Sequence, residues 1–237
     1  MERSSSSIIA FLSLAAIPAA LGAAPSANSE TVAHEAELRK ALDMAVEAMF
    51  TPGELDPHWN RGGIDLEQAV KARPNHVLVE VDKDGDRSVA IYSDRPVAEF
   101  IPPEWELLAE IGTDQAQSER SPIEISELDD GYYVASRSPY WRVGEASCSN
   151  FPTSARLYKA KGAAETEMPP EIAKFIFREM LERAKPYTVC TRHDVVGEGY
   201  GTRYFFKDGR SLPFFDDRSG KSTIVPMRPI SDLLKAE

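Results

Sequence analysis

The chain has few of the residues that mark the common kinds of catalytic and metal site. Its 237 residues include only two cysteines and four histidines, too few for a disulfide-rich scaffold or a thiolate zinc finger. It contains no Gly-x-Ser-x-Gly turn, no His-Glu-x-x-His pair and no complete phosphate-binding loop. We therefore expect no catalytic residues, no metal site and no cofactor.

Positive charge is also scarce. The chain carries 27 Lys and Arg against 38 Asp and Glu, a net charge of −11 at pH 7. A surplus of negative charge repels phosphate backbones and anionic lipid headgroups. The composition therefore argues against nucleic acid or a membrane surface as the main partner, and it leaves an unknown protein or a small molecule.

One long apolar run is present, and it lies at the amino terminus. Residues 8–24 read IIAFLSLAAIPAALGAA, between a short polar segment and a zone of small residues, as in a secretory signal peptide. Ala20 and Gly22 match the small residues that precede a cleavage site, so we expect cleavage after Gly22 or one residue later. The run is shorter than the roughly 20 residues of a membrane-spanning helix, and no Asn-x-Ser/Thr acceptor follows it. A periplasmic or secreted protein with no membrane span after cleavage is therefore favoured over a retained anchor.

The remaining chain alternates helical and strand patterns. Helices are expected over 31–50, 65–73, 104–111 and 171–185. Strands are expected over 76–81, 88–93, 123–128, 132–137, 140–145, 155–159, 187–193, 202–207 and 222–226. Because tight turns join most of these strands, the sequence predicts an α+β fold in which helices pack on the faces of an antiparallel meander sheet.

The same patterns divide the chain into four segments. We expect a signal peptide over 1–22, a flexible leader over 23–30, one α+β domain over 31–230 and a carboxyl-terminal tail over 231–237. One domain is favoured over two because no Pro/Gly/Ser-rich linker divides the central segment.

The two cysteines, Cys148 and Cys190, are expected to form a disulfide, because paired thiols oxidise in exported proteins. The alternative is a reactive thiol at Cys190 assisted by His193. Residues three apart on a strand point to opposite faces, so this second interpretation requires a bulge.

Two segments are candidates for ligand contact. A loop that ends in two glycines contains His58, Trp59 and Arg61, and binding groups often gather in loops, although loop aromatics also fill cores. On a predicted strand, the second candidate consists of Tyr140, Trp141 and Arg142. Aromatic rings there could stack on a flat ligand, or form part of a sheet-face core.

These observations favour an exported, non-catalytic binding or accessory protein that is stabilised by one disulfide. The first alternative is an envelope hydrolase whose catalytic residues are dispersed in the sequence, with His58, His193 and Asp194 as nominal candidates. The second is a structural component of the envelope without a ligand.

Overall fold

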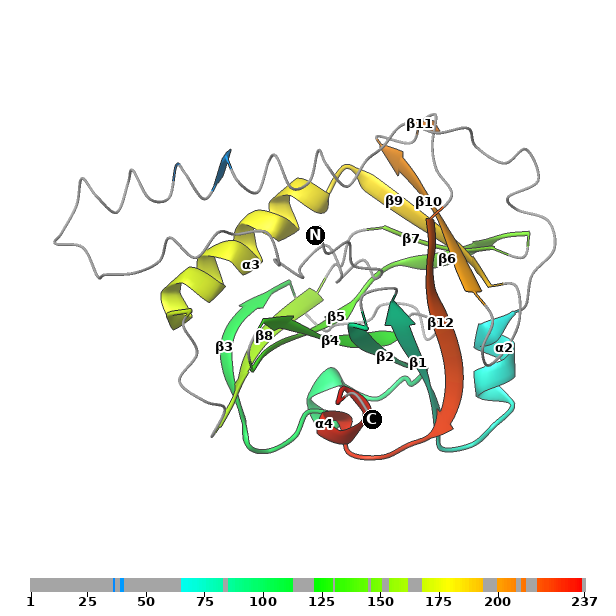
Figure 1. The fold of residues 1–237 in the computed structure, drawn as a ribbon, viewed down its shortest axis with the longest axis horizontal. Helices are drawn as coiled ribbons and strands as arrows, with labels where there is room; N and C mark the ends of the chain where they lie inside the picture. The colour runs from blue at the N-terminus through cyan, green and yellow to red at the C-terminus, as the bar shows by residue number, and fades with distance from the viewer. Residues whose placement is uncertain are drawn as a thin grey trace, which may run out of the picture.

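The fold is shown in Figure 1 as a computed structural model. It describes residues 36, 39–40, 65–82, 85–112, 122–129, 131–144, 146–150, 154–161, 168–193, 200–207, 210–211 and 217–235. The predicted signal peptide, the leader and most of the helix expected over 31–50 lie outside these described residues.

Strands dominate the described residues. They are β1 (His76–Asp82), β2 (Arg87–Ile91), β3 (Trp105–Ile111), β4 (Ile123–Asp129), β5 (Tyr132–Arg137), β6 (Tyr140–Val143), β7 (Ala146–Asn150), β8 (Ser154–Ala160), β9 (Tyr187–His193), β10 (Tyr200–Lys207), β11 (Arg210–Ser211) and β12 (Asp217–Pro226). They form one antiparallel sheet in the order β3-β8-β5-β4-β2-β1-β12-β10-β9-β7-β6, and β11 pairs with β10. This confirms the predicted antiparallel α+β architecture.

The sheet has two chemically different faces, because successive side chains on a strand point to opposite sides. In β1, Val77 and Val79 are buried in a core that includes the short helix α4 (Ile230–Leu233). Leu78 and Glu80 point to the other face. That face is concave, because residues of β1, β2 and β4 in the middle of the strand order and of β9, β7 and β6 at one end border a common pocket on it.

A long helix covers one half of the concave face. Helix α3 (Pro170–Ala184) begins with a proline in its first turn, where the missing N–H costs no intrahelical bond. Its fully buried Ile176 and Phe177 pack with Val134 of β5 and Leu157 of β8. The helix expected over 171–185 is therefore confirmed, and Figure 1 shows it lying along the β3–β8–β5 part of the sheet.

The other described elements are shorter. Helix α2 (Leu66–Lys71) is capped by Asp65, whose carboxylate accepts a 3.1 Å hydrogen bond from the backbone N–H of Gln68. The 3-10 helix η2 (Val97–Glu99) follows β2, and the loop before it is held by buried Arg137, which donates to the carbonyl oxygens of Ser93 and Arg95. No helix among the described residues is long and apolar enough to cross a membrane.

The carboxyl-terminal residues contribute to the core. Leu233 and Leu234 of the segment expected to be a tail are 1% and 9% exposed, and they pack on the convex face. The segment 231–237 is therefore tied to the sheet at least as far as Leu234.

The helix expected over 104–111 is wrong, because these residues form strand β3. The register of β3 against β8 shifts between Leu107 and Ala109. That irregularity breaks the alternation of buried and exposed residues that identifies a strand, and it leaves the apolar residues at a helix-like spacing. The strand is anchored at its start, where Trp105 stacks on Tyr133 of β5 with ring centroids 4.0 Å apart.

The strand expected over 140–145 is also corrected. It ends at Val143, and the chain turns at Gly144, whose positive φ of 59° suits a residue without a side chain. A further strand, β7, follows the turn. The sequence ASCSN of β7 is poor in β-branched and aromatic residues, so its strand propensity is low and pairing with β6 and β9 determines its structure.

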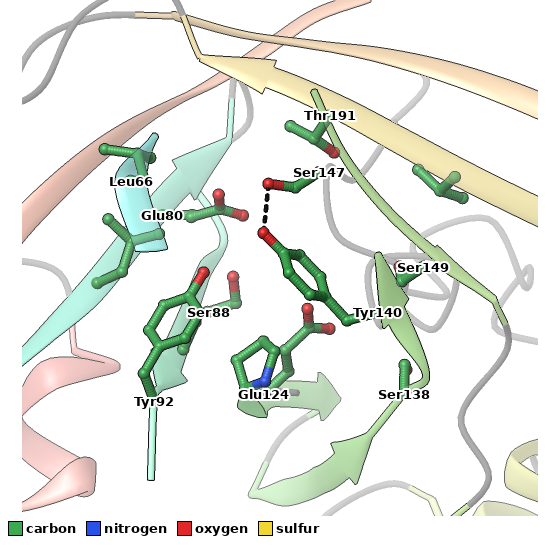
Figure 2. A pocket seen from close by; sticks show the side chains of 14 residues that line it. Leu66, Glu80, Ser88, Tyr92, Glu124, Ser138, Tyr140, Ser147, Ser149 and Thr191 are labelled. Carbon is green, nitrogen blue, oxygen red and sulfur yellow. Dashed lines mark hydrogen bonds between the residues drawn. The ribbon is translucent and has the colours of Figure 1, made fainter. Parts of the chain in front are cut away.

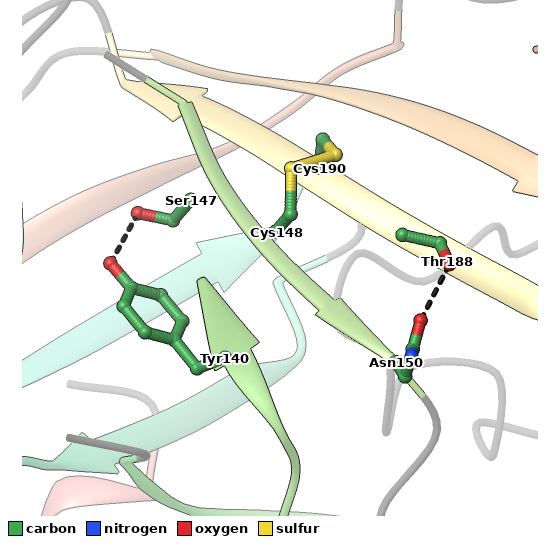
Figure 3. The surroundings of a disulfide bond; sticks show 6 residues. All are labelled: Tyr140, Ser147, Cys148, Asn150, Thr188 and Cys190. Carbon is green, nitrogen blue, oxygen red and sulfur yellow. Dashed lines mark hydrogen bonds between the residues drawn. A yellow bond between two sulfur atoms is a disulfide. The ribbon is translucent and has the colours of Figure 1, made fainter. Parts of the chain in front are cut away.

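The predicted disulfide is confirmed. Cys148 of β7 and Cys190 of β9 stand directly opposite each other, with Cα atoms 4.0 Å apart, and their bond closes a separation of 42 residues. Figure 3 shows this bond joining the two strands. On the same strand pair, the hydroxyl of Thr188 donates a 2.6 Å hydrogen bond to the side-chain oxygen of Asn150.

Candidate functional site

A pocket of about 70 Å³ lies in the half of the concave face that α3 leaves uncovered. It is large enough for a few water molecules or for a ligand of a few heavy atoms. Fourteen of the described residues line it: Leu66, Leu78, Glu80, Ser88, Ala90, Tyr92, Pro122, Glu124, Ser138, Tyr140, Ser147, Ser149, Val189 and Thr191. They come mainly from β1, β2 and β4 on one side, from β6, β7 and β9 on the other, and from α2, as Figure 2 shows.

A polar row across neighbouring strands forms part of this face. Strand pairing places Ser222 beside Glu80, Glu80 beside Ser88, and Ser88 beside Ser126. The hydroxyl of Ser222 donates a 3.2 Å hydrogen bond to Oε1 of Glu80, which helps to orient that carboxylate. The same row continues to Val134, which lies under α3, so the face changes from polar to apolar where the helix begins to cover it.

Three buried serines make this interior unusual. The Oγ atoms of Ser126, Ser136 and Ser138 are inaccessible to solvent and have no hydrogen-bond partner among the described residues. Ser138 lines the pocket and is 5% exposed. Buried polar atoms in folded proteins are nearly always paired with protein, water or ligand, so these hydroxyls are candidates for bonds to water or to a polar ligand.

The opposite wall of the pocket is formed by β6, β7 and β9. The hydroxyls of Tyr140 and Ser147 share a 2.8 Å hydrogen bond, which Figure 2 shows inside the pocket. The lining residues of β7 and β9 are the immediate neighbours of the two bonded cysteines: Ser147, Ser149, Val189 and Thr191. Because side chains alternate along a strand, the disulfide holds this wall together from the other side of the sheet.

Helix α2 connects the two walls at its amino-terminal end. Nη1 of Arg142 on β6 lies 2.6 Å from Oδ1 of Asp65, the residue that caps α2. One turn further along, Lys71 pairs with Glu67 at 2.5 Å, and its ammonium lies 5.8 Å from the centre of the Tyr92 ring. These contacts fix the position of Leu66, which lines the pocket.

The pocket disfavours additional negative charge. Burial raises the pKa of the Tyr92 phenol well above its usual value, and Tyr140, Glu80, Glu124 and Glu67 raise it further by electrostatic repulsion. Burial also raises the pKa of Tyr140 to about 12; the hydrogen bond from Ser147 opposes this shift, and Glu67 adds to it. Both phenols therefore remain protonated donors at neutral pH.

The residues predicted on β6 have three different positions. Tyr140 lines the pocket, and Arg142 lies in the ion pair with Asp65. Trp141 faces the other side of the sheet, opposite Cys148 in the register, and is 38% exposed. The structure thus brings one of the three into the candidate site.

The other predicted residues lie outside the described residues or are described only in part. His58, Trp59 and Arg61 lie outside the described residues, as does Asp194. Only the strand position of His193 is described, at the end of β9. The described residues therefore do not test the hydrolase hypothesis.

The sequence analysis missed several lining residues, among them Glu80, Ser88 and Glu124. Glu80 lies between Val79 and Val81, Glu124 lies between two isoleucines, and Ser88 precedes Val89. This alternation shows which residues share a face, but it does not show that the polar face curves into a pocket.

The chemistry of the lining suits hydrogen bonding to a small polar molecule. Carboxylates, hydroxyls and phenols provide both donors and acceptors. Within the described part of the chain, no group of three or more His, Cys, Asp or Glu side chains could hold a metal ion. The chain matches no protein-family model, no curated protein and no solved structure.

Proposed function

We propose that this chain is an exported, non-catalytic binding protein that holds a small polar ligand in the concave pocket. The signal-like sequence of residues 8–24 and the bond between Cys148 and Cys190 support a periplasmic or secreted location, because stable disulfides form in oxidising compartments. The low positive charge of the chain disfavours nucleic acid as the partner.

The observation that carries the proposal is the set of buried hydroxyls without protein partners, at Ser126, Ser136 and Ser138. Leaving a buried polar group unpaired costs about 1–3 kcal/mol. A face selected only for stability would bury apolar side chains there, as it does under α3. A polar cavity in the uncovered half is therefore better explained by binding than by folding.

Filling the pocket tests this function. Ala90 lines the pocket on β2, so Ala90→Leu would place three additional carbon atoms in it. Ala98→Leu, on the exposed side of η2, is the matched control. Binding is measured by NMR titration with a set of small amines, alcohols and carboxylates of four to six heavy atoms.

We expect at least one compound of this set to bind the wild type and the Ala98→Leu variant, and to bind the Ala90→Leu variant at least tenfold more weakly. If no compound binds, or if the pocket-filling variant binds as well as the control, the proposed function is wrong. Melting temperatures of both variants show whether the added carbons disturb the fold.

A further inference from the structure

We propose that ligand binding in the pocket is coupled to the oxidation state of Cys148 and Cys190. With the disulfide formed, β7 and β9 hold one wall of the pocket in its binding arrangement; with the disulfide reduced, that wall loosens and the ligand binds more weakly. Both cysteines are positioning residues, because neither is among the described residues that line the pocket. This inference rests on the proposed function and adds a redox dependence to it.

The wall consists of two cross-strand pairs that flank the disulfide. Four lining residues of β7 and β9 stand directly opposite one another, one pair on each side of the cysteine pair: Ser147 with Thr191, and Ser149 with Val189. Because side chains alternate along a strand, the sulfur atoms lie on the other side of the same strand pair. The bond therefore fixes the spacing and the register of four lining residues without touching the ligand.

Backbone pairing gives this wall limited support. The β6–β7 hairpin lies at the end of the strand order, and β7 pairs with β9 over only the four residues Ser147–Asn150. The sequence ASCSN of β7 contains no β-branched or aromatic residue, so its own strand propensity is low. Since the bond lies within this short pairing, its loss should release the wall before the rest of the sheet.

The effect extends to a fifth lining residue, Tyr140 of β6. Its hydroxyl lies 2.8 Å from the hydroxyl of Ser147, and Figure 3 shows Ser147 pointing toward Tyr140 and away from the disulfide. The Tyr140 hydroxyl therefore depends on the position of β7 for this hydrogen bond.

Two contacts outside the cysteine pair should keep the hairpin near the sheet after reduction. The hydroxyl of Thr188 donates to the side-chain oxygen of Asn150, and Arg142 forms its ion pair with Asp65 at the start of α2. A solvent-accessible ion pair and a single hydrogen bond contribute little to stability. We therefore expect the reduced protein to be folded, with a wall that is in its binding arrangement for only part of the time.

The bond is covered in the folded protein, because Cys148 and Cys190 are 0% and 3% exposed. A reductant reaches the sulfur atoms only when the strands open. Dithiothreitol, a dithiol, then attacks one sulfur atom as a thiolate, and its second thiol resolves the mixed disulfide. Two electrons and two protons pass to the protein, which gains two thiols, and dithiothreitol becomes a cyclic disulfide.

The test compares ligand affinity in the oxidised and the reduced protein. The probes are the small amines, alcohols and carboxylates of the set above, beginning with propylamine, propane-1,2-diol and propionate. Reduced wild type is prepared by unfolding in urea with dithiothreitol and refolding in its presence, and circular dichroism measures the folded fraction. We expect every compound that binds the oxidised protein to bind the reduced protein at least tenfold more weakly. This factor corresponds to a wall that is correctly arranged in at most about one-tenth of the reduced molecules.

Two variants separate wall position from stability. The double variant Cys148→Ala and Cys190→Ala should bind like the reduced wild type, and dithiothreitol should not change its affinity. The control is Ile176→Ala, at a fully buried position under α3 that lies outside the lining. Such a core truncation costs stability comparable to the loss of a disulfide. Its affinity should nevertheless stay within twofold of the oxidised wild type.

The coupling must also act in the opposite direction, because linkage is reciprocal. A saturating concentration of a compound that binds tenfold more tightly to the oxidised form should make the bond harder to reduce. The midpoint for reduction in dithiothreitol buffers should move by about 30 mV to more negative potential, the equivalent of tenfold for a two-electron couple.

Three results would overturn the coupling. Equal affinities of the oxidised and the reduced folded protein would do so and would leave the proposed binding function intact. If the reduced protein is unfolded, the titrations are repeated in trimethylamine N-oxide, which favours the folded state; a reduced chain that stays unfolded there would show that the bond serves the fold as a whole. If no compound binds the oxidised protein, the proposed function and the coupling are both wrong.

Discussion

Removing the disulfide provides a quantitative test of how the pocket wall is held. The perturbation is the double replacement Cys148→Ala and Cys190→Ala, which removes both sulfur atoms without leaving a free thiol. The bond spans 42 residues, and the chain-entropy relation for a loop of that length gives about 4 kcal/mol of stabilisation at 25 °C. The four lining residues beside the cysteines should also become more mobile.

The assay is urea denaturation of the oxidised wild type, the reduced wild type and the double variant, followed by tryptophan fluorescence. We expect the free energy of unfolding to fall by about 3–4 kcal/mol in the double variant, because β7 and β9 also remain paired through their backbones. Reduction should destabilise the wild type by a similar amount and leave the variant unchanged. A loss below about 1 kcal/mol, or two free thiols in the purified oxidised protein, would refute the reasoning.

Two further predictions concern the buried polar groups. Arg137→Ala should lower the free energy of unfolding by about 3 kcal/mol, because it removes two charged hydrogen bonds to carbonyl oxygens of the loop after β2. Arg178→Ala, on the exposed side of α3, should change it by less than about 0.5 kcal/mol; equal effects in urea denaturation would contradict this role of Arg137. The second prediction concerns alkaline pH. Burial is the largest cause that raises the pKa of Tyr133 and of Tyr140 from 10.0 to about 12, and it raises that of Tyr92 as well. The folded state keeps these protons after the unfolded chain has lost them, so stability should be full below pH 10 and fall between pH 10 and 12. Absorbance at 295 nm should show that at least three of the eight tyrosines ionise only in this range or above it, and complete ionisation near pH 10 in the folded protein would contradict the prediction.

The elements with strong local patterns could be predicted from the sequence. Helix α3 has a proline at its start and a wide apolar arc, and the β1–β2 hairpin has alternating apolar residues on both sides of its turn. Strand β3 was mistaken for a helix because a register shift next to Leu107 hides its alternation. Strand β7 was missed because its small polar residues have a low strand propensity, and it forms only by pairing with β6 and β9.

The candidate site depends on information that is not local. Glu80 and Ser88 lie on predicted strands, but the chain order does not show that β1 pairs with β12, or that β6, β7 and β9 curve round toward β2 and β4. The cysteine pair was the one long-range contact that composition could indicate. Tyr140 was selected for its aromatic ring, and the structure places its hydroxyl within the pocket, bonded to Ser147.

The most direct test of the binding site is a map of backbone amide shifts of the ¹⁵N-labelled oxidised protein during titration with the set of small amines, alcohols and carboxylates. Saturable shifts should gather at Ser88 on β2, Ser138 between β5 and β6, and Thr191 on β9, which border the pocket from different sides. The amides of α3 and β3 should remain unchanged. Shifts confined to α3 and β3, or no saturable shift at any of these positions, would contradict a ligand site inside the curved sheet.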